Sequence, residues 1–289
     1  MRVTQSLIER SVSQNLTDSL SRLAEAQRMV ATGIRVEKPS DDPVAAAEVM
    51  RINHALRAVE QFRRNTSAAR VRVSAEESVL NQVSDILTRV KEVGVGQATD
   101  TASASNRFVA GEEVDRLLQQ VIQLGNTRIG NDYIFGGSAT SSPPFQGTTY
   151  VGDDTVHQSE IGSAFTVDTN QTGRELFVDS GVFSTLQNLR DAMRTDDVDG
   201  IRAGLTALES GFENVQVHLT SIGARSREID MAMVTHDETE TNLLTARSDL
   251  REIDFEKATT EFLSTQTSLQ AARAAASRFL ETALTNFLR

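Results

Sequence analysis

The residues with the chemistry for catalysis or metal binding are few in this sequence, and one short segment gathers several of them. The run His-Asp-Glu-Thr-Glu at 236–240 places a histidine among acids, and on a helix His236 and Glu240 would share a face as residues i and i+4. Two such side chains could bind a metal ion. The alternative, which we favour, is a charged helix face on which His236 takes a polar core position that fixes packing register.

The other candidate groups also have structural interpretations. The adjacent acids Asp41 and Asp42 suit a helix cap better than a general acid–base pair, because neighbouring residues do not face each other across a cleft. Asp153-Asp154 resembles a turn, and further calcium ligands do not follow at loop spacing. Because the sequence also has no cysteine, nucleophile elbow, phosphate loop or dinucleotide fingerprint, we predict no catalytic site, no cofactor and no metal. A secreted helical enzyme using His236 is the contrasting alternative.

Charge and hydropathy argue against two classes of partner. The 289 residues carry a net charge of −11, whereas nucleic-acid binding requires clustered lysines and arginines. No run of 18 apolar residues is present, so we expect no insertion into a membrane. The N-terminus lacks the apolar stretch and cleavage site of a signal peptide, so export would use a route without such a signal. Aromatic residues, at 5%, argue against a large aromatic-rich core.

A seven-residue spacing of apolar side chains at the two ends of the chain is the strongest structural signal. Leu16, Leu23 and Val30, with Leu20 between them, predict an amphipathic helix. We expect this helix to end at Gly33, because glycine is common just beyond a helix C-terminus. The same spacing recurs near the C-terminus, in the rows Phe255, Phe262 and Leu269, with Phe279 in a neighbouring row.

Longer periodic runs fill most of the remaining chain. A helix is predicted from Pro43 to about Gly94, with two apolar rows, one of which is interrupted by Glu76. Further helices are predicted at about 107–125, at 182–193, and from Ile201 through Leu250, with a change of register after Asp254. Residues 131–179 differ, because Gly, Asp and Pro punctuate short runs there; this region is a hairpin cluster or a small inserted domain.

These elements predict one architecture. A narrow apolar stripe is not stable alone in water, so the terminal helices require partners, and the simplest arrangement pairs them with each other. We therefore predict a mainly α fold, an elongated rod of long antiparallel helices, with the N- and C-terminal helices paired as a coiled coil and a small β-rich insertion. The predicted parts are a terminal domain of 1–33 with 251–289, a connecting loop at 34–43, a helical rod domain of 44–130 with 180–250, and the β-rich region 131–179.

One stretch carries a family resemblance. Residues 32–65, TGIRVEKPSDDPVAAAEVMRINHALRAVEQFRRN, closely resemble the N-terminal region of the flagellin-like axial proteins, and within them the hook-associated protein 3 family. Further matches are SAEESVLNQVSDIL at 74–87, GNDYIFGG at 130–137, SPPF at 142–145 and the helix from Ile253. The resemblance spans nearly the whole chain, whereas residues 146–178 match only in general character.

The resemblance implies a structural role outside the cell. Members of this family form the junction between hook and filament of the bacterial flagellum and are exported, without signal cleavage, by the flagellar secretion apparatus. The implied partners are copies of the same chain in a ring, another hook-associated protein, flagellin, and a cytoplasmic chaperone that holds the C-terminal helix. Flagellin itself is the nearest alternative, against which the Pro39–Pro43 run and the Tyr-Ile-Phe-Gly-Gly stretch speak. A cytoplasmic coiled-coil scaffold is the generic one.

Within this framework the terminal helices complete their core only in the assembly, so their ends are expected to be disordered in the free monomer and to fold on incorporation. The loop before the second helix is expected to stiffen the joint between the terminal helices and the rest. The assembly contacts are assigned to Leu16, Leu20, Leu23, Val30, Phe255, Phe262, Leu269, Phe279 and Phe287. The hinge loop and helix cap are assigned to Gly33, Arg35, Pro39, Ser40, Asp41, Asp42 and Pro43.

Overall fold

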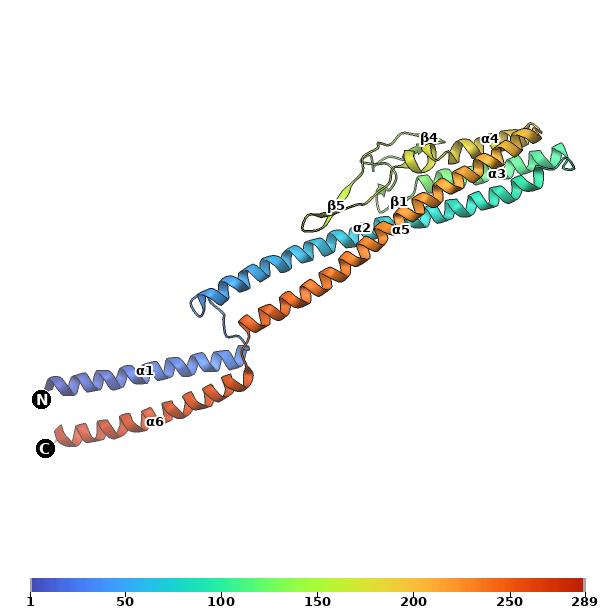
Figure 1. Cartoon of the computed structure of the whole chain (residues 1–289). Coiled ribbons are helices and arrows are strands. Elements are labelled where there is room, and N and C mark those ends of the chain that lie inside the picture. Colours follow the sequence, from blue (N-terminus) through green and yellow to red (C-terminus); the bar gives the residue numbers. More distant parts are fainter. Residues whose placement is uncertain (1, 288–289) are drawn as a thin grey trace. The chain divides into compact units, whose positions relative to one another are not determined.

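The computed structural model describes the backbone of residues 2–287 and the side chains of residues 10–278. Most of the chain is helical (Figure 1). The helices are α1 (Arg2–Thr32), α2 (Pro43–Gln97), α3 (Ala104–Gly125), α4 (Val182–Arg194), α5 (Val198–Arg251) and α6 (Phe255–Phe287), with a π-helix, η1, at Arg174–Asp179. The strands are β1 (Arg128–Ile129), β2 (Asp132–Tyr133), β3 (Phe145–Gln146), β4 (Thr149–Tyr150), β5 (Gln158–Gly162) and β6 (Phe165–Asp168).

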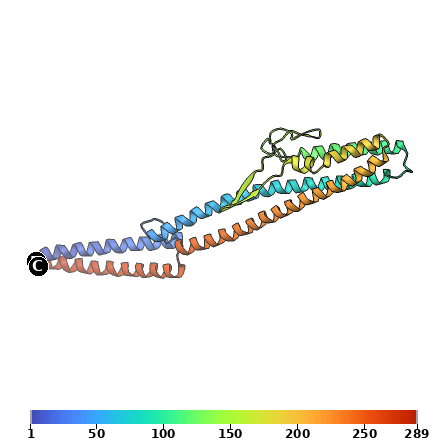
Figure 2. The same ribbon diagram turned by 45° about the horizontal axis from the view of Figure 1, so that its top comes forward.

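The chain forms two compact units, each of which is described by itself. The terminal unit combines both ends of the chain, up to Arg57 and from Glu240 onward, and the central unit is Ala58–Thr239. In the terminal unit α1 and α6 lie side by side in antiparallel directions, so that the start of α1 and the end of α6 lie at the same end of the pair, in both views (Figures 1 and 2). The predicted mainly α fold of long antiparallel helices, with paired terminal helices and a small β insertion, is confirmed.

In the central unit the long helices α2 and α5 pack in one constant register. Ser84 contacts Gln216 and Lys91 contacts Glu209, so a step of seven residues forward on α2 matches seven backward on α5. The heptad rows predicted from the sequence form this seam, and eight of their apolar members are at most 2% exposed: Val73, Leu80 and Leu87 from α2, and Ile201, Leu208, Val215, Ile222 and Ile229 from α5. Apolar periodicity therefore produces the observed packing directly.

The helices α3 and α4 pack against each other and complete this core. Val114, Leu118 and Val121 of α3 and Leu186 and Leu189 of α4 are at most 1% exposed, in the same cluster as the α2–α5 seam.

Residues at the helix ends determine where α3 and α4 begin. The Ser103 side chain accepts a hydrogen bond from the Asn106 amide at 3.2 Å and so caps the start of α3, and Gly181, at φ +77°, precedes α4.

The β-rich region consists of three antiparallel hairpins, β1–β2, β3–β4 and β5–β6, each with two strands. Five of the chain's aromatic residues gather here, and Phe145 lies 5.2–5.4 Å, between ring centroids, from Tyr150, Phe177 and Phe183. The side chains of Phe135, Phe145, Phe177 and Phe183 are at most 3% exposed and belong to the central core. A small aromatic-rich core therefore forms at the hairpins, although aromatics are scarce overall.

Candidate functional site in the terminal helix pair

The chain crosses twice between the terminal helices and the long helices, and main-chain hydrogen bonds join the two crossings. We call residues 33–42 and 252–254 the joint. Within it the Arg35 amide donates to the Arg251 carbonyl at 2.8 Å, and the Ile253 amide donates to the Gly33 carbonyl at 3.0 Å. Ile34 and Glu252 form an isolated antiparallel bridge between these bonds. The connection is thus a short two-stranded ladder rather than two independent loops.

Gly33 ends α1 and turns the chain into this ladder. Its φ is +71°, in the left-handed region that side chains with a Cβ rarely adopt. Its amide donates to the Met29 carbonyl at 2.8 Å, which satisfies one of the free carbonyls at the helix C-terminus. Apart from Gly33 and its two chain neighbours, no atom of the described residues lies within 4 Å of the Cβ position that a larger residue would have there. The glycine is therefore required by backbone conformation and not by space.

Arg35 ties the start of α2 to the end of α5. Its Nη1 donates to Oδ2 of Asp42 at 3.1 Å and its Nη2 donates to the carbonyl of Leu250 at 2.8 Å. The guanidinium group has parallel donors in a fixed plane, so one side chain can hold both segments at a set separation. Arg35 is exposed, so its effect is on geometry more than on stability.

The two adjacent acids of the loop act on different parts of the main chain. Oδ2 of Asp41 accepts hydrogen bonds from the amides of Glu37 and Lys38, at 3.1 and 2.9 Å, and these bonds hold the pKa of Asp41 below its ordinary value. Oδ1 of Asp42 accepts from the Ala45 amide at 3.0 Å and caps α2; that bond, followed by Arg35, lowers the pKa of Asp42. The two carboxylates do not form an acid–base pair.

The remaining loop residues frame this arrangement. Pro39 and Ser40 are exposed within the turn closed by Asp41, and Pro43 is the first residue of α2, where a missing amide hydrogen costs nothing. Each hinge residue is thus located, and a hinge role in assembly stays a prediction.

Asp254 caps the start of α6. From the sequence this residue was identified only as the point after which the heptad register changes. Its Oδ1 accepts from the amides of Glu256 and Lys257 at 3.1 and 3.2 Å, and the Lys257 amide is the largest cause that lowers its pKa. It therefore starts α6 as Asp42 starts α2. The signal was available, because an aspartate directly before a periodic apolar run is a common helix start.

The α1–α6 pair has a thin core. Ala26, Ala258 and Leu269 are buried, whereas Leu16, Leu23, Val30 and Phe262 are half-buried. The large apolar side chains of Leu20, Phe255 and Leu263 are 41%, 63% and 54% exposed. Phe279 and Phe287 lie outside the described side chains.

Small and polar side chains line the groove between these two helices. Ser19, Arg22 and Glu25 line it from α1, and Ser264 and Ser268 from α6. Together with the exposed apolar residues, they give the pair an outer surface of mixed polarity. The assignment of the terminal residues to assembly contacts stays a prediction.

The histidine among acids lies in the seam of the central unit. His236 is 7% exposed, its Nε2 is 3.4 Å from Oγ1 of the buried Thr66, and its ring stacks on Phe62. This is the polar core position that we favoured. Among the residues that the structure describes, no three His, Asp or Glu side chains gather as a metal site would require.

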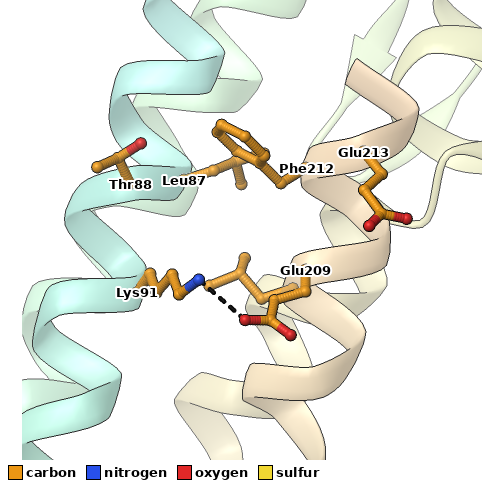
Figure 3. Close-up of a pocket in the computed structure, with 7 residues that line it drawn as sticks. Leu87, Thr88, Lys91, Glu209, Phe212 and Glu213 are labelled. Carbon is orange, nitrogen blue, oxygen red and sulfur yellow. Dashed lines mark hydrogen bonds and ion pairs between the residues drawn. The ribbon is translucent and has the colours of Figure 1, made fainter. Parts of the chain in front are cut away.

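The groove between α2 and α5 shows what the central unit offers a small molecule (Figure 3). Leu87 and Leu208 form its floor, Phe212 flanks it, and Lys91 and Glu209 pair across it at 2.9 Å between Nζ and Oε1. The lysine and glutamate neutralise each other. The groove is therefore a gap in the helix packing spanned by an ion pair, and its lining suggests no reaction.

Sequence reasoning also missed two buried arginines. Nη1 of Arg107 lies 2.5 Å from Oδ1 of Asp196, and its other nitrogens donate to the carbonyls of Gln97 and Thr99. This arginine joins the α2–α3 loop to the α4–α5 turn. Arg225 pairs with Glu76 inside the α2–α5 seam. The sequence did carry a signal for Glu76, because a charged residue there interrupts an apolar row. Isolated residues such as Arg107, Arg225 and Asp196 carry no such pattern.

Comparison with known proteins places these features in a family. The model of the bacterial flagellin N-terminal helical region matches residues 3–140, and that of the flagellin C-terminal helical region matches residues 205–288. The flagellar hook-associated protein 3 of Escherichia coli is 24% identical over 300 aligned positions, which cover 94% of this chain and 95% of that protein. The protein of the same name from Salmonella typhimurium is 32% identical, over 61% of this chain and 57% of its own length.

A solved structure agrees with the fold. The flagellar junction protein FlgL from Legionella pneumophila superposes with a TM-score of 0.61 at 16% identity, over 71% of this chain and all of that one. Within the part of the chain that the structure describes, no helix is long and apolar enough to cross a membrane. With flagellin-like helical regions at both ends and hook-associated protein 3 relatives over nearly its full length, the chain belongs to the flagellin-like family of flagellar axial proteins.

Proposed function

We propose that this protein is a structural subunit of the bacterial flagellum, located outside the cell, that joins the hook to the filament. The observation that carries the proposal is the α1–α6 pair, a helix pair with a thin core and exposed Phe255 and Leu263, in a chain whose relatives are hook-associated proteins. Contiguous exposed apolar surface marks a site for protein partners. We assign that role to the α1–α6 pair because the relatives of this chain are hook-associated proteins. The protein acts by assembly and not by catalysis.

The proposed partners are copies of this chain in a ring, another hook-associated protein on the hook side, and flagellin on the filament side. Head-to-tail contacts between identical subunits that do not close on themselves produce a helical array. The proposed ring of this chain is one level of such an array. We assign these contacts to a terminal domain of 1–33 with 251–289. The other proposed parts of the subunit are the helical domain of 44–130 with 180–250 and the hairpin region 131–179.

The ends of the terminal helices fold on incorporation. In the free chain these ends lack partners from other subunits, so the cost of ordering them is offset only when other subunits bury their apolar side chains. A chaperone in the cytoplasm covers α6 until export, and export does not involve a cleaved signal peptide. A photo-crosslinking residue at Leu263 should trap the chaperone in the cytoplasm, whereas the same residue at the exposed Val217 of the central unit should not.

Immunogold labelling tests the location. Label on purified flagella should mark a single band between hook and filament, and label along the whole filament would overturn the proposal. Deletion of the gene should leave hooks intact and release flagellin into the medium, and the wild-type gene should restore filaments.

Flagellin is the second candidate function, because models of both flagellin ends match this chain. A deletion strain distinguishes the two. Loss of the only flagellin should leave hooks that still carry their junction proteins, with no filament protein in the medium.

A further inference from the structure

The seam between α2 and α5 contains one buried charged pair among apolar side chains. Glu76 of α2 is 0% exposed and Arg225 of α5 is 9% exposed, and Nη2 of Arg225 lies 3.3 Å from Oε2 of Glu76. The apolar side chains of Val73 and Ile222 are at most 1% exposed in the same core cluster. A carboxylate in such surroundings is costly unless charge and hydrogen bonds compensate it.

A third element rests on this pair. Nη1 of Arg225 donates to the carbonyl of Asp168, the last residue of β6, at 3.2 Å, and the Gln171 amide donates to Oε1 of Glu76 at 3.2 Å. The Asn65 side chain, also on α2, donates to the carbonyl of Glu160 in β5 at 2.8 Å. Thus Glu76 and Arg225 connect the β5–β6 hairpin to both long helices.

Hydrogen bonding around Glu76 is incomplete. The hydrogen bonds that Glu76 accepts are at the long end of the normal range, and three neighbouring arginine donors (Nε of Arg225, Nε and Nη2 of Arg72) and the acceptor Oε1 of Gln171 are buried without a hydrogen-bond partner. The charged groups facing Glu76 are Arg225 from α5 and Arg72 from α2. The strand presents only the carbonyl of Asp168, whose carboxylate accepts a hydrogen bond from Gln158.

We propose that Glu76 and Arg225 form a proton-sensitive latch that holds the β5–β6 hairpin on the α2–α5 pair, and that the latch is tighter when Glu76 carries a proton. A protonated Glu76 keeps its contact with Arg225 as an acceptor and no longer buries a negative charge away from water; Arg225 loses its counter-ion but keeps the Asp168 carbonyl as a second acceptor. When the hairpin lifts, water reaches the carboxylate and the charged form is no longer penalised.

The direction of the pH effect follows from the two states of the hairpin. Burial raises the pKa of Glu76 to about 7 when the hairpin is closed, against the opposing effects of Arg225 and Arg72, while a solvated glutamate has its ordinary value of 4.5. The closed hairpin therefore binds the proton more tightly. Its extra stability is complete below about pH 4.5 and is lost as the pH rises through about 7.

Hydrogen–deuterium exchange on the full chain, followed by mass spectrometry between pH 5 and 8, tests the latch. After correction for intrinsic exchange, protection of the peptide spanning 158–171 should fall by up to about tenfold per pH unit between about pH 5 and 7, because the states differ by at most one proton. A peptide from α4 is the internal reference. Protection that is independent of pH, or that rises with pH, would overturn the proposal.

Substitutions identify the group that titrates. Glu76→Gln should abolish the pH dependence, and Glu77→Gln, which removes the same charge at the next residue, should keep it. His157 lies directly before β5, with Nε2 3.2 Å from the Gly137 carbonyl, and His236 lies further along the seam. Persistence of the dependence in Glu76→Gln, or its loss in His157→Gln, would contradict the latch.

A paired variant covers the case in which Glu76→Gln does not fold. Replacing both Glu76 and Arg225 with Met removes the buried charges together, which proteins often tolerate better than loss of one partner. The hairpin of this variant should stay protected at every pH without the fall between pH 5 and 7. A double variant that keeps the wild-type pH profile would disprove the latch.

Discussion

The central unit and the terminal unit of this protein are built from the same kind of helix, yet among the side chains that the structure describes the central unit has the more completely buried core. In the central unit a third and a fourth helix and three hairpins cover the α2–α5 seam, and Leu80, Leu189 and Phe177 are fully buried. In the terminal unit α1 has α6 as its partner, and Phe255 and Leu263 are more than half exposed. A heptad stripe specifies that a helix needs neighbours, but not whether its own chain supplies enough of them.

The largest expected difference lies between matched leucines in the two units. Leu189→Ala in the central core should lower the free energy of unfolding by about 2–5 kcal/mol, because a cavity forms in closely packed surroundings. Leu269→Ala in the α1–α6 seam should cost about 1–2 kcal/mol or less, because the thin core can collapse around the change. Urea unfolding with hydrogen-exchange readout of each unit measures both, and equal losses would show that the terminal unit is as fully packed.

Gly33→Ala should have an intermediate effect that is confined to the joint. The left-handed φ of Gly33 penalises any Cβ by about 1 kcal/mol, although no atom obstructs the space. Tryptic cleavage after Arg35 should become faster, while protection in the central unit stays unchanged. Gly96→Ala, also in open space but with ordinary helical backbone, is the control and should not accelerate cleavage.

Acid should loosen the joint without loosening the central core. The pKa values of Asp41 and Asp42 are lowered by main-chain hydrogen bonds, so their stabilising effect is present above about pH 4 and is lost as the pH falls through the lowered values. Exchange of amides in residues 36–46 should therefore increase between pH 4 and pH 2. Asp42→Asn, which keeps a capping side chain but does not titrate, should reduce this change; an unaltered response would exclude Asp42 as its source.

The smallest effect on stability is expected where the effect on function is greatest. Phe255→Ser removes an exposed side chain, so the free energy of unfolding of the monomer should change by no more than about 0.5 kcal/mol. Motility and filament formation should nevertheless fail. Val217→Ser, at similar exposure in the central unit, should leave motility and filament formation intact. Equal motility of the two variants would show that the exposed surface of the α1–α6 pair is not needed for assembly.

Sequence periodicity alone determined the helices, their apolar faces and the ends set by Gly33, Asp42 and Pro43, because these depend on interactions within a few residues. The pairing of α1 with α6 also followed, since an unpartnered stripe requires a neighbour.

Only the tertiary structure decided how distant residues meet. The ladder between Arg35 and Arg251, the Glu76–Arg225 pair and the aromatic cluster around Phe145 join residues far apart in the chain. No local pattern encodes such contacts, because an arginine or a phenylalanine has the same sequence signal whether it meets solvent, a carbonyl or a carboxylate. Three-dimensional packing alone makes that choice.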